Sequence, residues 1–359
     1  MIAEEKILRR CKMKKILSLI IGVVVMGAVN FMNISKAYAQ DSIMKLIESL
    51  EVGEPVCYQN LTIIPVYTSN KIRDHTVYTC LEEALKNRLL EITELEGGYV
   101  PQVKITNLSK QHIYIMGGEI LTGCKQDRIV GRDVLVGPGS RNLIVPVYCV
   151  ERGRWSYRSK VFYSKDTLGT YQLRAEAQIA RSSSQTTIWN EIAELSKKMN
   201  IDSRTNAYQE LYDKEEVKEK IASFERKFQS IPQLYDDTVG VIVAVGKKIV
   251  SADIFVNPEF FKKMHPKLLK SSALSAISST EKGSITQEEA AQFLYTLGNK
   301  EYKQKLAIGL GEEFSAIDEE VNVNALVYRD VIIHLSAFPH QERIYKRERE
   351  DERRIPVIR

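Results

Sequence analysis

The spacing of apolar residues changes partway along the chain, and this change constrains the fold more than any other feature. From about Leu61 to Trp155 the apolar runs are short and separated by turn residues, as in LTIIPVY, HIYIM, GEILTG, DVLVGPG and LIVPVYCV. Short runs at close spacing are typical of strands in sandwiches and barrels. Within them, Thr79-x-x-Glu82 has the form of a capping box that opens a short helix. We therefore expect a β-rich N-terminal half, folded as a sandwich or a partly closed barrel.

The region from about Thr170 to Ile231 has helical periodicity instead. Apolar residues recur there at steps of three and four, which places them on one face of each of two helices. They are Ile188, Ile192, Leu195 and Met199 in the first helix, and Val217, Ile221, Phe224, Phe228 and Ile231 in the second. This pattern predicts a helical hairpin in the centre of the chain.

The C-terminal third returns to mixed structure. VGVIVAV and KIVSADIFV flank Gly246 and predict a hairpin. Asn257-Pro258 and the capping box Thr286-x-x-Glu289 each begin a helix, and ALVYRDVIIHLSAF predicts a closing hairpin. The chain as a whole is thus expected to be an α+β protein that ends in a hairpin-helix-helix-hairpin unit.

The N-terminus has the features of a secretory signal. A basic start ends at Lys15, an apolar run follows from Ile16 to Val29, and Ala37-Tyr38-Ala39 places small residues where a signal peptidase reads them. The apolar run is short for a membrane span. We expect residues 1–39 to be a signal peptide and the protein to be exported, to a periplasm or outside the cell. An uncleaved N-terminal anchor is the alternative.

Removal of this segment changes the charge balance. Cleavage before Gln40 leaves 320 residues with 44 basic and 44 acidic side chains, so the mature net charge is zero. Net charge therefore favours neither nucleic acid nor a membrane surface as a partner. We expect residues 40–60 to form a linker, residues 61–340 a single domain, and residues 341–359 a solvated charged tail.

The cysteines leave two possibilities open. Cys57, Cys80, Cys124 and Cys149 follow the predicted cleavage site, and none of them forms a C-x-x-C pair. Buried free thiols and a single disulfide are equally compatible with an exported β-rich protein.

The stretch from Gly117 to Trp155 combines many charged residues with tight turns. Gly117-Gly118 fixes the direction of the carboxylate that follows, and arginine suits phosphate or carboxylate groups. We predict a pocket for a small anionic ligand there. The predicted acid or base residues are Glu119 and Glu151, and the predicted ligand-binding residues are Lys125, Gln126, Arg128, Arg154 and Trp155. A structural network of ion pairs is the alternative, because strand surfaces also collect such residues.

Other catalytic signatures are absent from the sequence. It contains no G-x-S-x-G, Walker loop, H-E-x-x-H or G-x-G-x-x-G, and its five histidines are scattered. We therefore predict no metal site and no cofactor. His334 lies in an apolar strand and is expected to be a hydrogen-bonded core residue.

The same stretch carries a family resemblance. GGEILTGCKQDRIV and LIVPVYCVERGRW are similar to the ARPP-1 domain, the ARG and rhodanese-phosphatase-superfamily-associated protein domain, and the likeness extends over about Leu61 to Pro339. It implies that the three regions fold as one unit. Neighbours of the family include poly(ADP-ribose) glycohydrolase-type domains, which implies an ADP-ribose-like or phosphorylated ligand.

Three functions remain open on this basis. A binding module for a small anionic, phosphorylated or nucleotide-like ligand is the first expectation. A hydrolase acting on a phosphorylated or glycosidic bond is the second, and a structural or envelope-interaction protein is the third. We expect no nucleic-acid partner and no membrane contact after signal cleavage, and the sequence identifies no protein partner.

Overall fold

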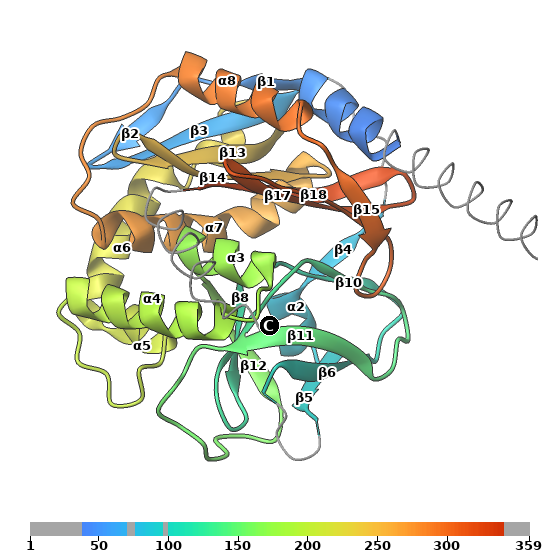
Figure 1. The fold of residues 1–359 in the computed structure, drawn as a ribbon, viewed down its shortest axis with the longest axis vertical. Coiled ribbons are helices and arrows are strands. Elements are labelled where there is room, and N and C mark those ends of the chain that lie inside the picture. The colour runs from blue at the N-terminus through green and yellow to red at the C-terminus, as the bar shows by residue number, and fades with distance from the viewer. Residues whose placement is uncertain (1–37, 70–75, 96–99, 341–359) are drawn as a thin grey trace, which may run out of the picture.

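A computed structural model describes residues 38–69, 76–95 and 100–340 of the chain. Figure 1 shows a large sheet with helices on both of its faces and a second β-rich part beyond the lower helices. The predicted signal segment lies almost wholly outside the described residues, and the predicted tail lies wholly outside them. No helix among the described residues is long and apolar enough to cross a membrane.

The large sheet joins strands from both ends of the chain. Its order is β1-β3-β13-β14-β18-β17-β16-β15, with β2 paired to β3, and all neighbours are antiparallel. The strands are β1 (Leu50–Val52), β2 (Val56–Tyr58), β3 (Leu61–Thr68), β13 (Thr238–Val245), β14 (Lys248–Phe255), β15 (Lys303–Leu306), β16 (Glu312–Ile317), β17 (Val321–Tyr328) and β18 (Val331–Pro339). The first predicted strand therefore pairs with a C-terminal strand.

The residues expected to form a linker are ordered parts of this sheet and its cover. Residues 38–48 are helical and pack on the sheet, and β1 and β2 pair with β3. Ile43 is fully buried and Ile47 nearly so, in the core that they share with the sheet. Their burial of apolar surface is the reason that residues 40–60 differ from the predicted linker.

The second β-rich part contains the other predicted strands. A six-stranded sheet has the order β12-β8-β9-β11-β6-β5, and a three-stranded sheet has the order β10-β7-β4. The strands are β4 (Tyr78–Cys80), β5 (Leu90–Glu94), β6 (Gln102–Asn107), β7 (His112–Ile115), β8 (Glu119–Gly123), β9 (Arg128–Val130), β10 (Val134–Val136), β11 (Leu143–Cys149) and β12 (Phe162–Leu168). The larger sheet curls into a half-barrel, which confirms the prediction of a partly closed barrel.

The helices follow the predicted order. They are α2 (Leu81–Lys86), α3 (Tyr171–Ile179), α4 (Ser184–Lys198), α5 (Gln209–Asp213), α6 (Glu215–Phe228), α7 (Pro258–Ile277) and α8 (Gln287–Gly298). The apolar stripe of α6 is buried, as predicted, at Val217, Ile221, Phe224 and Phe228. The two helices predicted to form a hairpin, α4 and α6, pack mainly on other elements: α4 on α3 and β11, and α6 on α5 and α7.

Two predicted caps are present with their hydrogen bonds. The Asn257 side chain accepts from the Phe260 N–H at 2.8 Å at the start of α7. At the start of α8, Thr286 and Glu289 exchange the two hydrogen bonds of a capping box. These caps satisfy backbone donors that the first helical turn leaves free.

Three apolar cores hold the layers together. One lies beneath residues 38–48 and α8, the largest lies on the other face of the sheet around α6 and α7, and the third fills the half-barrel. The α+β class is thus confirmed. Cys57, Cys80, Cys124 and Cys149 are all free, and only Cys57 is exposed.

Candidate functional site

The loop between β11 and β12 is held by Arg154. Its guanidinium donates to both carboxylate oxygens of Glu151, at 2.8 and 2.5 Å, and to Asp127 Oδ1 at 3.1 Å. It also donates to the carbonyl oxygens of Gly123, Cys124 and Ser156. Every N–H of the guanidinium plane therefore has a partner within the protein. Arg154 joins the loop to the turn after β8.

The predicted residues around Arg154 belong to the same buried network. Gln126 donates to the Glu151 carbonyl oxygen at 3.0 Å and accepts from Arg128 at 3.3 Å. The Arg128 side chain is 1% exposed and lies 3.6 Å from the Glu94 carboxylate. The structure thus brings four of the predicted residues together, and they bind one another.

The carboxylates of this network have opposite pKa shifts. Burial alone would raise the pKa of Glu151, but hydrogen bonds from Arg154 and the Asp127 N–H hold it below its usual range. Burial and the nearby Glu151 charge raise the pKa of Asp127 to about 6. Glu151 is thus an ionised, fully hydrogen-bonded group that anchors the loop. As it stands, it lacks the free lone pair that a general base needs.

The outer surface of this loop and of the neighbouring turn after β8 presents cations and aromatic rings. The Lys125 ammonium lies 4.9 Å from the centre of the Trp155 ring and 5.1 Å from that of Tyr157. These rings are 53% and 63% exposed, respectively. Arg158, whose side chain is 53% exposed, lies 3.4 Å from the Glu151 carboxylate and 3.8 Å from that of Asp127. We call Lys125, Trp155, Tyr157 and Arg158 the aromatic platform.

Glu119 lies apart from this network. It begins β8 and contacts Lys267 of α7, which also contacts Glu82 of α2 and lies 3.7 Å from Asp166 of β12. The side chains of Lys267 and Glu119 are only 2% and 3% exposed, whereas those of Glu82 and Asp166 are 27% and 35% exposed. Lys270, one turn further along α7, lies 3.2 Å from Asp166. We call these five residues the Lys267 cluster.

The carboxyls of the Lys267 cluster differ in their affinity for protons. Burial, together with the nearby Glu119 charge, raises the pKa of Glu82 to about 8. Burial would also raise the pKa of Asp166, but a hydrogen bond from Glu82 and the charges of Lys267 and Lys270 hold it below its usual range. Glu82 therefore holds a proton more tightly than Asp166 does.

A second buried charge network includes the predicted core histidine. His334 is 0% exposed, and its two ring nitrogens lie 2.7 Å from Asp133 and 3.1 Å from Asp253. Arg174 forms a two-pronged ion pair with the same Asp253. Burial alone would lower the pKa of His334, but the two carboxylates raise it to about 9. His334 is therefore a charged, hydrogen-bonded core residue.

The turn before β8 joins the Lys267 cluster to the network around His334. The Gly117 N–H donates to Asp133 Oδ1 at 2.8 Å, and the Met116 N–H donates to Glu119 Oε2 at 3.0 Å. Gly118 has a φ of +101°, and a β-carbon on it would lie 2.4 Å from the Arg174 side chain. Only glycine suits this position, because the backbone conformation and the close approach both exclude a side chain. The glycine pair thus aims Glu119 at Lys267, as expected of a tight turn.

Sequence reasoning missed Glu82, Asp166 and Lys267. The predicted capping box of Glu82 is absent, because Thr79 bonds Gln111 and α2 has no side-chain cap. Glu82 turns to Lys267 instead. The available signal was Lys267 itself, a lysine on the apolar face of a helix. Within the described residues, no group of three His, Cys, Asp or Glu side chains is placed to hold a metal ion.

Comparison with known families decides the family. The sequence model of the ARG and Rhodanese-Phosphatase-superfamily-associated Protein domain, ARPP-1, matches residues 49–338. The chain belongs to this family. The ARPP-1 region contains the aromatic platform and the buried networks around Arg154, Lys267 and His334. It begins before the predicted start at Leu61, so that it includes β1 and β2. No curated protein and no solved structure matches the chain.

Proposed function

We propose that the protein is a binding module for a small anionic ligand, of phosphorylated or nucleotide-like chemistry, which binds at the aromatic platform. The observation that carries this proposal is the position of Lys125 over two half-exposed rings, Trp155 and Tyr157. An ammonium can pair with a phosphate, and an exposed indole face can stack on a flat base.

The buried network beneath the platform supports this proposal. Arg154 and Arg158 together balance the charges of Glu151 and Asp127, so these carboxylates leave no net negative charge beneath the ligand. Lys125 then adds a positive charge at the surface. A loop fixed by this many hydrogen bonds loses little conformational freedom when a ligand binds, which favours affinity.

In this proposal some of the predicted binding residues contact the ligand and the others support the loop. Lys125 and Trp155 would touch the ligand, and Tyr157 and Arg158 join them from the structure. Gln126, Arg128 and Arg154 would hold the loop in place. An ADP-ribose-like ligand fits this division, because its adenine offers a flat face and its diphosphate offers two anionic groups.

A thermal-shift panel tests the proposal. The full protein is heated with ADP, ADP-ribose, sugar phosphates and inorganic phosphate, beside the variants Lys125→Ala and Lys227→Ala. Lys227 is an exposed lysine on α6, away from the loop, and serves as the matched control. A ligand at about a hundredfold excess over its Kd adds about 2.7 kcal/mol of stability. The shift should persist in Lys227→Ala and vanish in Lys125→Ala. Equal ligand-induced rises in melting temperature in the two variants would refute the aromatic platform as the ligand-binding site.

A hydrolase is the second candidate function, and the Lys267 cluster favours it. Glu119 is a predicted acid or base residue that lies in this cluster beside Glu82 and Asp166. Glu82 would donate a proton and Asp166 would accept one. Nitrophenyl phosphate and nitrophenyl glycosides test the idea. Turnover should fall above about pH 8, where Glu82 loses its proton, and Glu82→Gln should abolish it. Absence of turnover in the native protein would remove this candidate.

We further propose that the protein is exported and that residues 1–39 are removed. The basic start, the apolar run and Ala37-Tyr38-Ala39 support cleavage before Gln40. Because Ala39 is fully buried in the folded chain, this cleavage must come before folding. Mass spectrometry of protein recovered from the cell envelope or the medium should find Gln40 at the N-terminus. An intact N-terminus on protein inside the cell would refute export.

A further inference from the structure

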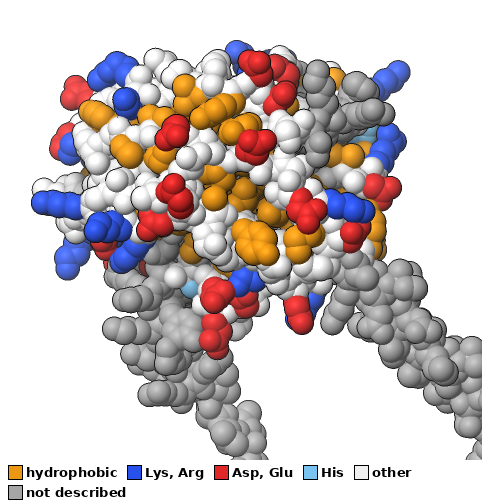
Figure 2. All heavy atoms as spheres, turned by 90° about the horizontal axis from the view of Figure 1, so that it is seen from above, with side chains coloured by type: hydrophobic (Ala, Val, Ile, Leu, Met, Phe, Trp, Pro, Cys, Tyr) orange, Lys and Arg blue, Asp and Glu red, His pale blue; other side chains and the backbone are white. Residues whose placement is uncertain are grey.

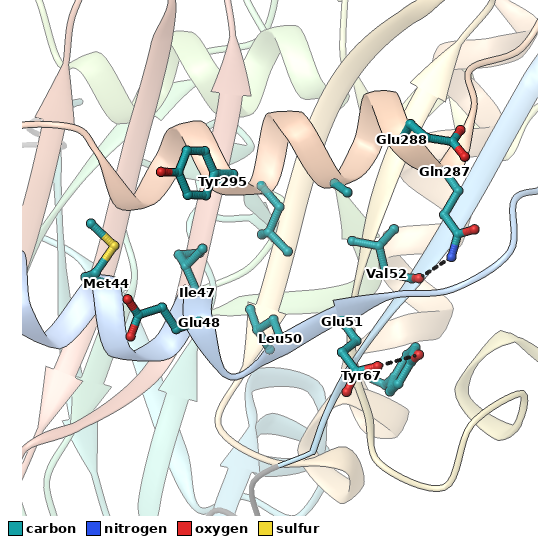
Figure 3. Close-up of a pocket in the computed structure, with 12 residues that line it drawn as sticks. Met44, Ile47, Glu48, Leu50, Glu51, Val52, Tyr67, Gln287, Glu288 and Tyr295 are labelled. Carbon is teal, nitrogen blue, oxygen red and sulfur yellow. Dashed lines mark hydrogen bonds between the residues drawn. The ribbon is translucent and has the colours of Figure 1, made fainter.

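An apolar groove lies at the opposite end of the molecule from the half-barrel strands (Figures 1 and 3). It runs between the helix of residues 38–48, β1 and α8, and its volume is about 570 Å³. Ile47, Leu50 and Leu294 lie at its base and belong to the core beneath. Figure 2 looks down on this face and shows hydrophobic side chains gathered across its middle, with acidic side chains around them. Concave apolar surface of this kind commonly marks a binding site.

The charged residues that line the groove are all acidic. They are Glu48 from the first helix, Glu51 from β1 and Glu288 from α8. Among the residues that the structure describes, no lysine or arginine pairs with any of the three. Glu51 accepts a hydrogen bond from Tyr67, and α8 contains no basic residue. The groove thus joins an apolar floor to an uncompensated negative rim.

The geometry selects a helix as the occupant. The free edge of β1 offers little to an added strand, because β1 has three residues and Gln287 of α8 already donates to the Val52 carbonyl oxygen at 2.6 Å. α8 forms one wall, and the helix of residues 38–48 followed by β1 forms the other, as Figure 3 shows. Grooves of this kind bind amphipathic helices by their apolar faces. Tyr295 stands on the α8 wall with 61% of its surface exposed, and tyrosine is enriched among residues that dominate interfaces.

We propose that this groove binds a basic amphipathic helix of a partner protein. The apolar face of the helix covers Leu50, Leu294 and Tyr295. Its lysine or arginine residues meet Glu48, Glu51 and Glu288. The acidic rim requires a positively charged partner, because an acidic helix would place like charges beside the three carboxylates. The groove is separate from the aromatic platform and can be tested without it.

Fluorescence anisotropy with designed peptides tests this proposal. The probe is a labelled helix of about four turns, or about 14 residues, with leucine on one face and lysine on the other. A matched peptide carries glutamate in place of lysine. We expect the full protein to bind the lysine peptide and not the glutamate peptide, with affinity that falls as salt rises.

Two sets of variants locate the binding. The triple variant Glu48→Gln, Glu51→Gln, Glu288→Gln removes the rim charges and should weaken binding about tenfold or more. Tyr295→Ala should weaken it without changing the charge. The control triple Glu215→Gln, Glu216→Gln, Glu219→Gln removes three exposed acids from α6 and should leave binding unchanged. Equal loss in both triples would show non-specific attraction and overturn the proposal. Equal binding of the two peptides would overturn it as well.

Discussion

At the scale of single residues, Lys267 shows how a buried charge fixes this fold. Its ammonium contacts carboxylates from α2 and β8 and lies 3.7 Å from the Asp166 carboxylate of β12, so one side chain ties α7 to three elements of the other β-rich part. A buried cation with several carboxylate partners stays charged, and its loss leaves negative charges in the interior.

Removal of this cation should therefore be severe. Lys267→Met keeps the apolar stem and removes the charge, and we expect a loss of about 3–5 kcal/mol in the free energy of unfolding, measured with urea near neutral pH. Lys262→Met removes a partly exposed lysine from the same helix and should cost less than about 0.5 kcal/mol. Adding Glu82→Gln and Glu119→Gln to Lys267→Met should restore part of the loss. Equal stability of the two single variants would contradict the role given to Lys267.

The raised pKa of His334 predicts that the stability of the protein depends on pH. Its pKa is raised from 6.5 to about 9 in the folded protein, so its stabilising charge is fully present below about pH 6.5 and is lost as pH rises through about 9. The shift corresponds to about 3 kcal/mol. His334→Gln should therefore be much less stable than the native protein at pH 6, and the difference should shrink by pH 10. Urea unfolding of both proteins across this range measures the effect. A difference that does not change with pH would mean that His334 is neutral in the fold.

The sequence predicted some of these residues and not others. A lone histidine in an apolar strand must find a hydrogen-bond partner, so the role of His334 could be inferred without knowing the partner. The pair Gly117-Gly118 likewise indicated that Glu119 is held in a fixed direction. The partners of Lys267 could not be predicted, because they come from distant parts of the chain and only the packing of α7 brings them together. The role of Glu82 was predicted wrongly, because its spacing from Thr79 matches that of a capping box.

At the scale of elements, the loop between β11 and β12 depends on Arg154. Arg154→Lys keeps the charge but cannot reach two carboxylates and three carbonyl oxygens at once. We expect it to cost about 3 kcal/mol in the free energy of unfolding and to abolish ligand binding at the platform. Arg152→Lys changes an exposed arginine of the same loop, which lies over the Trp189 ring, and should cost under about 1 kcal/mol. Equal effects of the two changes, by urea unfolding, would contradict the anchoring role.

Element types could be predicted because each leaves a local pattern. The caps of α7 and α8 and the apolar stripe of α6 depend on neighbours within one turn or a few turns. Strand pairing depends on distant residues. β3 therefore appeared to belong with the strands that follow it, whereas it pairs with β13. Residues 40–60 appeared to form a linker because their strands are too short to show alternation.

At the scale of the whole molecule, two surfaces of different chemistry lie at opposite ends. The aromatic platform is cationic and projects from the half-barrel, and the groove beside α8 is apolar with an acidic rim. The buried His334 network joins the large sheet to the second β-rich part, because His334 belongs to β18 and Asp133 precedes β10 of the three-stranded sheet. We therefore expect one cooperative unit with two independent binding surfaces.

Hydrogen exchange of the full protein, with and without ADP-ribose, tests the central claim most directly. The account predicts slower exchange in residues 124–127 and 151–161, no change along β1 and α8, and loss of the effect in Lys125→Ala. Slower exchange confined to residues elsewhere, or the same protection in Lys125→Ala, would contradict the assignment of the aromatic platform as the ligand-binding site.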